Sequence, residues 1–174
     1  LLRDISTLNR LDDASDMLTD FDDVDVSQIV ANIQKETALQ VEANGMKFNN
    51  LLPNGIMVRG NHSLLYSVFR NLTDNAIAYA GEGKEITISC RQDDDMWHFT
   101  FRDNGVGVPP EHLGRLFERF YRVDKGRSRK MGGTGLGLAI VKNAVLLHGG
   151  SISGKNGEDG GLVFDFYLRK LSIK

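Results

Sequence analysis

The glycine-rich segment MGGTGLGLA, at residues 131–139, is the part of this sequence best suited to binding phosphate, because it leads into a predicted helix. Amide N–H groups at a helix N-terminus bind phosphate well when no side chain covers them. Gly133, Gly135 and Gly137 would permit that close approach. The segment has neither the P-loop spacing nor the strand-first dinucleotide motif. Its glycines could also serve only the packing of a helix start, so it stands here as a candidate phosphate site.

A second glycine-rich loop, DNGVGVP, spans residues 103–109. Asp103 ends a predicted strand, so its carboxylate could face a pocket floor and accept a hydrogen bond from an exocyclic amine such as that of adenine. Gly105 and Gly107 would let a flat ring lie against the backbone. Taken alone, a β-turn that uses Asp and Asn side chains is the simpler interpretation.

Two asparagines, Asn71 and Asn75, stand four residues apart at the border of the apolar face of a predicted helix. Their amide oxygens are hard ligands of the kind that suits Mg²⁺, which keeps waters and phosphate oxygens in its shell. In isolation such a pair is usually just two amides on a helix surface.

Charge is unevenly spread along a chain whose net charge is only −2. Residues 1–25 hold eight Asp against two Arg, whereas residues 115–130 hold seven Lys and Arg against two acidic residues. A basic run needs an anionic partner or solvent. Because this run is short and leads straight into the glycine-rich segment, it favours the phosphate of a small ligand over DNA.

Composition and length indicate a globular domain. The chain has 174 residues, 41% of them apolar and 25% charged, typical of one soluble domain. No stretch reaches 18 uncharged apolar residues, so none is expected to span a bilayer. The single Cys90 excludes an internal disulfide framework and a cysteine-based zinc cluster. The four histidines show no metal-ligand spacing, and His148 is predicted to end a helix, where its charge would suit the helix dipole.

Apolar periodicity and turn signals outline the elements that must position these residues. They predict helices over 1–19, 27–44, 61–80, 111–117 and 136–147. They predict strands over 46–52, 56–59, 85–91, 97–103, 151–155 and 162–168. Ser27 and Asn61 are expected as N-caps and Gly45 as the residue after a helix end. This order predicts an α+β two-layer sandwich rather than an alternating parallel sheet.

The predicted N-terminal helix carries one apolar stripe, formed by Leu1, Ile5, Leu8, Leu11, Ala14 and Leu18. The stripe suits pairing with another helix, and it suits equally well a helix that lies on its own domain.

Taken together and in order, these motifs resemble the catalytic and ATP-binding domain of sensor histidine kinases. That domain belongs to the ATPase superfamily of type II topoisomerases, mismatch-repair ATPases and large heat-shock chaperones. Residues 71–79 resemble the N box, 103–107 the first glycine box, FERFYR at 117–122 the F box and 132–137 the second glycine box. The resemblance covers the whole chain.

The resemblance also implies a fold and a domain layout. The fold is a mixed, mainly antiparallel sheet covered on one face by helices, preceded by an N-terminal helix. Residues 1–20 would be the end of the second helix of a dimerisation domain, 21–26 a linker, and 27–174 the catalytic ATP-binding domain.

At the base end of ATP, the resemblance implies that Asp103 hydrogen-bonds the adenine amine. Gly105 and Gly107 would shape the adenine pocket, and Tyr79 would flank the nucleotide.

At the phosphate end, Asn75 would ligate Mg²⁺ with Asn71 beside it, and Arg122 would reach toward the γ-phosphate. The backbone of Gly133, Thr134, Gly135, Leu136 and Gly137 would cradle the phosphates, and residues 123–132 would form a lid over ATP.

The implied activity is a protein-histidine kinase of two-component signalling. It would pass the γ-phosphoryl group of Mg-ATP to a histidine on a dimerisation helix outside these residues, from which an aspartate of a response regulator would receive it. The full-length protein would be a homodimer, and this part its cytoplasmic domain, held at the membrane only by segments elsewhere. The fragment itself is expected to bind Mg-ATP without phosphorylating itself.

Two positions bear on the alternatives. ATP-hydrolysing members of the superfamily use a Glu at the place of Asn71 as general base, and an amide cannot accept that proton, so a conformational ATPase is disfavoured. The kinase N box often has Lys where this chain has Ala78, which leaves a non-transferring ATP-binding module as the alternative to the kinase.

Overall fold

The structure, a computed structural model, describes residues 21–119 and 136–171. Within these residues the order of elements is β1 Asp22–Asp25, α3 Val26–Glu36, α4 Ala38–Ala43, β2 Lys47–Asn50, β3 Met57–Gly60, α5 His62–Tyr79, β4 Glu85–Asp93, β5 Met96–Asp103, the 3₁₀ helix η1 Pro110–Arg115, α7 Gly137–Leu147, β6 Ile152–Asn156 and β7 Leu162–Arg169. The predicted helix over 1–19 and the predicted lid lie outside the described residues.

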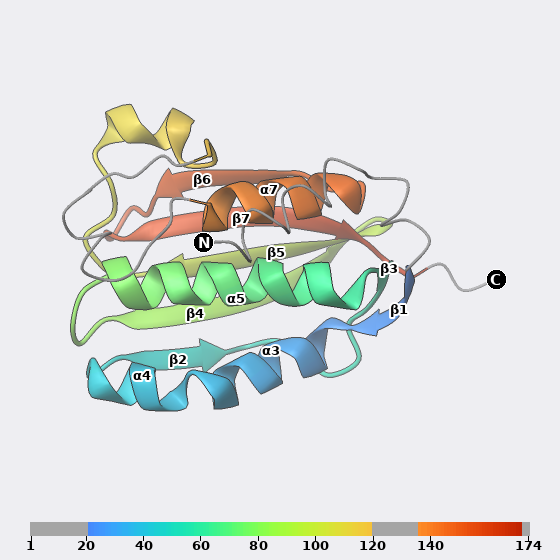
Figure 1. The fold of residues 1–174 in the computed structure, drawn as a ribbon, viewed down its shortest axis with the longest axis horizontal. Helices are drawn as coiled ribbons and strands as arrows, with labels where there is room; N and C mark the ends of the chain where they lie inside the picture. The colour runs from blue at the N-terminus through green and yellow to red at the C-terminus, as the bar shows by residue number, and fades with distance from the viewer. Residues whose placement is uncertain (1–20, 120–135, 172–174) are drawn as a thin grey trace.

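The main sheet has five strands in the order β2-β4-β5-β7-β6, and only β2 and β4 run parallel. Helices α3, α4, α5 and α7 all lie over the same face of this sheet (Figure 1). The predicted α+β sandwich, with a mixed and mainly antiparallel sheet, is therefore confirmed. A separate two-stranded sheet joins β1 to β3, so the segment predicted as a linker contains a paired strand.

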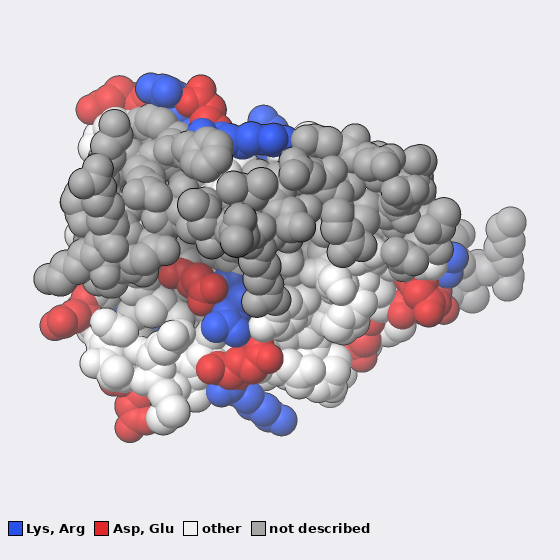
Figure 2. Space-filling model, in the orientation of Figure 1, with Lys and Arg blue, Asp and Glu red and all other residues white. Residues whose placement is uncertain are grey.

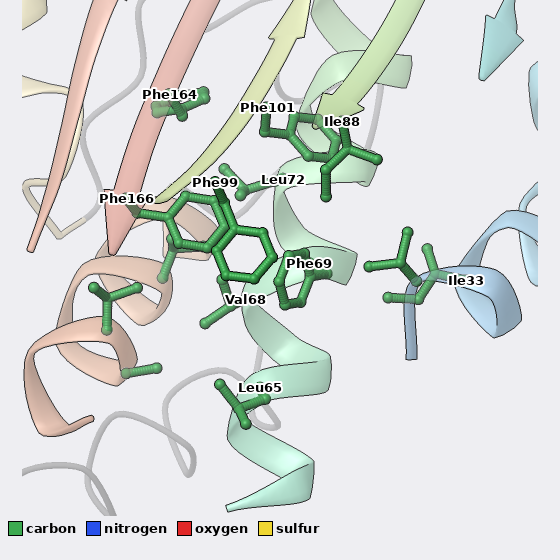
Figure 3. Close-up of a cluster of buried hydrophobic side chains, with 14 of the residues drawn as sticks. Ile33, Leu65, Val68, Phe69, Leu72, Ile88, Phe99, Phe101, Phe164 and Phe166 are labelled. Atoms are coloured by element: carbon green, nitrogen blue, oxygen red, sulfur yellow. The ribbon is translucent and has the colours of Figure 1, made fainter. Parts of the chain in front are cut away.

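An aromatic cluster fixes α5 on the sheet. Phe69 of α5 packs edge-on against Phe99 of β5 at 5.5 Å between ring centroids, and Phe99 stacks on Phe166 of β7 at 5.2 Å. All three rings are buried, and Figure 3 shows them between the helix and the two strands. Burying one such side chain contributes about 1.5–3 kcal/mol, so this cluster strongly favours one seat for the helix.

The sequence of α5 explains both its start and its orientation. The side chain of Asn61 accepts a hydrogen bond from the N–H of Leu64 at 3.0 Å, which confirms Asn61 as the N-cap. Apolar residues then recur every three or four positions on the buried face: Leu64, Leu65, Val68, Phe69, Leu72 and Ala76. Asn71 and Asn75 fall at the border of this face, where they are half-buried.

The segment 27–44, predicted as one helix, forms two, and its N-cap is not Ser27. The buried Thr37 separates α3 from α4 and bonds its hydroxyl back to the carbonyl of Ile33. Asp25 caps α3 by accepting from the N–H of Gln28 at 3.1 Å. Ser27 instead donates to Pro53 O and accepts from Ile56 N, which ties a distant turn to the helix. Helix periodicity does not reveal such a long-range partner.

Two other elements differ from the sequence prediction. The predicted strands over 46–52 and 56–59 form as β2 and β3, but they pair with different partners, β4 and β1. The predicted helix over 111–117 is the 3₁₀ helix η1, which begins at Pro110. Gly45 has φ +63° after the end of α4, as expected for a residue that closes a helix.

On the face that carries the helices, acidic and basic side chains are interspersed over the described residues in view (Figure 2). One ion-paired group links α3 to α5, where Arg70 lies 3.3 Å from Glu36 and 3.1 Å from Asp74. Exposed pairs of this kind contribute little to stability. None of the helices in the described residues is both long and apolar enough to cross a membrane.

His148 does follow the end of α7, but the expected charge on it is wrong. Its Nε2 accepts from the backbone N–H of Asn61 at 3.0 Å, and its Nδ1 lies 2.6 Å from the carbonyl oxygen of Ala144. Since Nε2 must keep its lone pair to accept, Nδ1 carries the proton and the ring is neutral. Burial lowers the pKa of His148 below its ordinary value of 6.5, opposed by the bond to Ala144. The imidazole therefore joins the start of α5 to the end of α7.

We expect His148→Ala to destabilise the domain by about 1–3 kcal/mol above pH 6.5, because it leaves the buried N–H of Asn61 without an acceptor. In the unfolded chain the imidazole of residue 148 binds a proton near pH 6.5, whereas in the folded chain it does so only at a lower pH. Wild-type stability should therefore decline as the pH falls from 6.5 toward the lower folded pKa, and its margin over the variant should narrow. Urea denaturation on both sides of pH 6.5 measures this.

The exposed His62 supplies the control. His62→Ala should stay within about 0.5 kcal/mol of the wild type. A margin for His148→Ala that widened under acid would mean that the folded ring is charged.

Candidate functional site

Eight of the predicted site residues lie in the described part of the chain, and they come from three elements. Asn71, Asn75 and Tyr79 lie in the C-terminal half of α5, Asp103, Gly105 and Gly107 at the end of β5 and in the loop after it, and Leu136 and Gly137 at the start of α7. Arg122, Gly133, Thr134 and Gly135 lie outside the described residues.

The carboxylate of Asp103 is held by two backbone amides. Its Oδ1 accepts from the N–H of Gly105 at 2.9 Å and from the N–H of Leu162 at 3.3 Å. Burial raises the pKa of Asp103, and these two amide bonds oppose the rise. Among the described residues no donor reaches Oδ2. The side chain is thus fixed in direction, with one oxygen available to an incoming donor.

Gly105 is required by its contact with the end of α5. A Cβ at Gly105 would lie 2.1 Å from the carbonyl oxygen of Ala80, and the next residue, Val106, donates its N–H to that same oxygen at 3.2 Å. No side chain fits such an approach. The loop after Asp103 is therefore seated on the C-terminus of α5, directly after Tyr79.

The turn between β6 and β7 contributes residues that sequence reasoning missed. A Cβ at Gly161 would lie 2.0 Å from the carbonyl oxygen of Asp103, and the following residue, Leu162, supplies one of the two amides on its carboxylate. The sequence did hold a signal, since Gly160-Gly161 opens the last strand. A glycine before a strand usually indicates only a turn, but Gly161 both forms the turn and allows the close approach to the carbonyl oxygen of Asp103.

At the other end of the site, Asn71 meets the start of α7. Its Nδ2 donates to the carbonyl of Ser67 at 2.8 Å, and its Oδ1 would lie 3.0 Å from a Cβ placed on Gly137. The lack of a side chain at Gly137 therefore lets the helix start close to Asn71. Leu136, the described residue at the N-cap position of α7, makes no side-chain capping hydrogen bond to the first amides of the helix.

Asn75 lies one helical turn beyond Asn71 on the same side of α5, and no hydrogen bond of its side chain is found within the described residues. Two amide oxygens beside a helix N-terminus form a donor set that fits Mg²⁺ with phosphate oxygens and water, because Mg²⁺ prefers hard oxygen ligands and keeps part of its water shell. The described residues contain no cluster of three or more His, Cys, Asp or Glu that could hold a metal ion by themselves.

Comparison with known sequences assigns this chain to a family. The sequence model described as "Histidine kinase-, DNA gyrase B-, and HSP90-like ATPase" matches residues 60–172. The sensor-like histidine kinase SenX3 of Mycolicibacterium smegmatis is 39% identical over 152 residues, which are 87% of this chain and 39% of that protein. The phosphate regulon sensor protein PhoR of Haemophilus influenzae is 36% identical over 170 residues, 98% of this chain and 39% of that protein. The chain thus spans well under half of either relative.

Solved structures agree with this assignment. The mycobacterial sensor histidine kinase MprB superposes with a TM-score of 0.76 at 27% identity, covering 87% of this chain and 100% of that one. The histidine kinase AdeS of Acinetobacter baumannii has a TM-score of 0.80 and covers 99% of this chain and 78% of that one, at 23% identity. At that identity the likeness concerns the fold alone.

The contact of Gly161 with Asp103 can be tested against a matched glycine. Gly161 and Gly55 have nearly the same backbone, with φ +78° and +79°, but an added Cβ at Gly55 meets nothing within 4 Å. Both alanine variants should lose about 1–2 kcal/mol to the left-handed conformation. Gly161→Ala should lose about 1–3 kcal/mol more, because a backbone oxygen must move. Urea denaturation of both variants measures the difference, and equal losses would contradict the close contact.

Proposed function

Because this chain belongs to the family of histidine kinase-, DNA gyrase B- and HSP90-like ATPases, we propose that it is the catalytic domain of a sensor protein-histidine kinase. The observation that carries the proposal is the carboxylate of Asp103, which backbone amides fix through Oδ1 while no donor among the described residues reaches Oδ2. It lies at one end of the candidate site, and the start of α7 lies at the other. Such a site has an acceptor for a base at one end and donors for phosphate at the other.

The base end suits adenine. Oδ2 of Asp103 would accept a hydrogen bond from the exocyclic amine. Gly105 and Gly107 would shape the adenine pocket indirectly, because their missing side chains let the loop pack against Ala80 and Asn156 instead of leaving room for the ring. Tyr79, the last residue of α5, would flank the nucleotide. A hydrogen bond to a charged acceptor contributes about 1.5–3 kcal/mol, enough to select an amine over a carbonyl at that position of the base.

The phosphate end suits a magnesium-bound triphosphate. The amides of the segment from Gly133 through Thr134, Gly135 and Leu136 to Gly137 would cradle the phosphates at the start of α7, where the helix dipole favours negative charge. Asn75, with Asn71 beside it, would hold Mg²⁺, which neutralises phosphate charge when bound. Arg122 would supply positive charge toward the γ-phosphate.

Transfer to a protein group is favoured over hydrolysis by the chemistry of Asn71. An amide cannot take a proton from water at neutral pH, and this one is already tied to the carbonyl of Ser67. In the proposed reaction a neutral histidine nitrogen attacks the γ-phosphorus, a P–N bond forms, and the bond to the β,γ-bridging oxygen breaks to release ADP. The domain's part is to position and to stabilise charge.

The acceptor histidine is proposed to lie outside these residues. His98 is 8% exposed with Nε2 at 2.8 Å from Asp165 Oδ1, and both ring nitrogens of His148 are engaged. His62 begins α5, roughly 20 Å along the helix axis from Asn75. None of these three is placed to receive phosphate at the site.

The proposed partners follow from this chemistry. They are a dimerisation domain that carries the acceptor histidine, a second copy of the protein in the full-length homodimer, and a response regulator whose aspartate takes the phosphoryl group. The domain would work on the cytoplasmic side of a membrane-anchored sensor. A module that binds ATP without transferring phosphate is the second candidate, favoured by Ala78 in place of the lysine common in the kinase N box.

Substitution of Asp103 tests the adenine assignment. In Asp103→Asn the amide oxygen should stay toward the N–H groups of Gly105 and Leu162, which turns the NH₂ toward the adenine amine and sets donor against donor. ATP affinity should fall roughly 10- to 100-fold. Inosine triphosphate, which presents a carbonyl at the same position, should lose much less affinity. Calorimetric titration with both nucleotides measures this, and unchanged ATP affinity would exclude Asp103 as the base-selecting residue.

A labelling experiment tests phosphoryl transfer. With γ-labelled ATP and Mg²⁺, the chain alone should yield negligible phosphoprotein, because the acceptor histidine is proposed to lie outside these residues. Addition of a separately prepared dimerisation hairpin with its histidine should give acid-labile phosphate on the hairpin, and Asp103→Asn should strongly reduce this labelling at ATP concentrations below saturation. Strong labelling of the chain alone would identify one of its own histidines, such as His62 or His112, as the acceptor. ATP binding with no transfer to the hairpin would favour the non-transferring module.

A further inference from the structure

The side chain of Asn156, the last residue of β6, pairs with the backbone of the loop that follows Asp103. Its Oδ1 accepts from the N–H of Val108 at 3.0 Å, and its Nδ2 donates to the carbonyl of Val108 at 2.7 Å. Val108 belongs to no strand, so this amide gives its backbone the two hydrogen bonds that a neighbouring strand would otherwise supply. The partners are 48 residues apart in sequence.

Gly107 fits this arrangement sterically. It has φ +67°, and a Cβ on it would lie 2.7 Å from Oδ1 of Asn156 and 3.0 Å from the carbonyl oxygen of Gly161. Any side chain at this position would displace the Asn156 amide from Val108. The loop glycine and the distant asparagine therefore depend on each other.

The same hairpin holds the other end of the loop. Asn156 and Leu162 lie directly opposite each other in the pairing of β6 with β7. Asn156 bonds Val108, and the N–H of Leu162 bonds the carboxylate of Asp103. The loop from Asp103 to Val108 is thus fixed at both ends by one pair of facing residues.

We propose that Asn156 is a positioning residue for the base-binding loop, and this rests on the proposed function of Asp103 in binding adenine. Among the described residues, no hydrogen bond joins the side chain of Asn156 to the Asp103 carboxylate or to the start of α7. It sets the path of Gly105–Val108, and with it the space between the loop and Oδ2 of Asp103. Its loss frees one end of the loop while Leu162 still holds the other.

A positioning role and a merely structural role give different binding data. Loss of a structural residue lowers the folded fraction and weakens every ligand equally. Loss of a positioning residue weakens only the ligand that uses the base-binding loop. Inorganic tripolyphosphate with Mg²⁺ has no base, so it reports on the phosphate end alone.

The test compares Asn156→Ala with wild type for Mg-ATP and Mg-tripolyphosphate, at a temperature where denaturation curves show both proteins fully folded. ATP affinity should fall roughly tenfold, as expected for the loss of about one net hydrogen-bond pair, with tripolyphosphate affinity within about twofold of wild type. Hydrogen exchange at the Val108 amide should accelerate, with the amides of Phe99 and Phe101 in the sheet unchanged. Asn49→Ala is the matched control, because Asn49 also donates from its side-chain amide, to Thr87 in the sheet, and both affinities should stay at the wild-type values.

If Asn156→Ala does not fold, Asn156→Asp is measured in its place. The aspartate keeps the acceptor for Val108 N–H but sets its second carboxylate oxygen against Val108 O, acceptor against acceptor, so an ATP-specific loss is again expected. Unchanged ATP affinity, or equal losses of ATP and tripolyphosphate, would overturn the positioning role and leave the proposed function standing. If the wild-type protein bound ATP no more tightly than tripolyphosphate, the adenosine part would contribute nothing to affinity. That result would overturn the proposed function of Asp103 itself, and the base-specific role of Asn156 with it.

Discussion

The contact of Phe69 with Phe99 and Phe166 determines where α5 lies, and the site is arranged around that helix. With its aromatic face fixed on β5 and β7, α5 presents Asn71 and Asn75 at the edge of the core instead of in it. Its C-terminus at Ala80 becomes the seat for the loop that carries Asp103. A shift of the helix by a fraction of a turn would separate the amides from the start of α7, so packing of apolar rings far from any ligand sets the geometry of the polar groups.

Close backbone approach is the second condition for this site. At Gly105 and Gly161 an added Cβ would meet a backbone carbonyl oxygen at 2.1 and 2.0 Å, and at Gly137 it would meet the side-chain oxygen of Asn71 at 3.0 Å. Glycine loses more conformational entropy on folding than any other residue. The several glycines at this site therefore reduce local rigidity, and in return they allow close contacts that a side chain would block. The rigidity is supplied by neutral polar side chains instead. His148 joins α5 to α7, and Asn156 joins the loop after Asp103 to the β6–β7 hairpin, each by satisfying backbone groups of a segment distant in sequence.

The electrostatics are consistent with a site that is organised before ligand arrives. Asp103 keeps its carboxylate buried because two backbone amides share one of its oxygens, and burial still raises its pKa. His148 stays neutral because its lone pair is committed to Asn61. Neither group forms a salt bridge among the described residues. Fixed dipoles rather than mobile ions hold the site, and such dipoles need little reorganisation when a charged ligand binds.

The sequence by itself determined the fold class, the cap at Asn61, the buried face of α5 and the residues brought to the site from α5, β5 and α7. Those features depend on local periodicity, on caps and on glycine spacing, which are written into short stretches of chain. Only the tertiary structure decided the roles of Ser27, His148, Gly161 and Asn156. From the sequence, Ser27 is interpreted as an N-cap, but in the structure it bonds Pro53 and Ile56. His148 is interpreted as a charged helix end, but in the structure its ring bonds Asn61 and Ala144. Gly161 and Asn156 lie between two predicted strands, and their contacts with the loop after Asp103 are seen only in the folded structure. The hydrogen-bond partners of these side chains and the nearest neighbour of this glycine come from segments dozens of residues away. Local sequence patterns do not predict contacts over that separation.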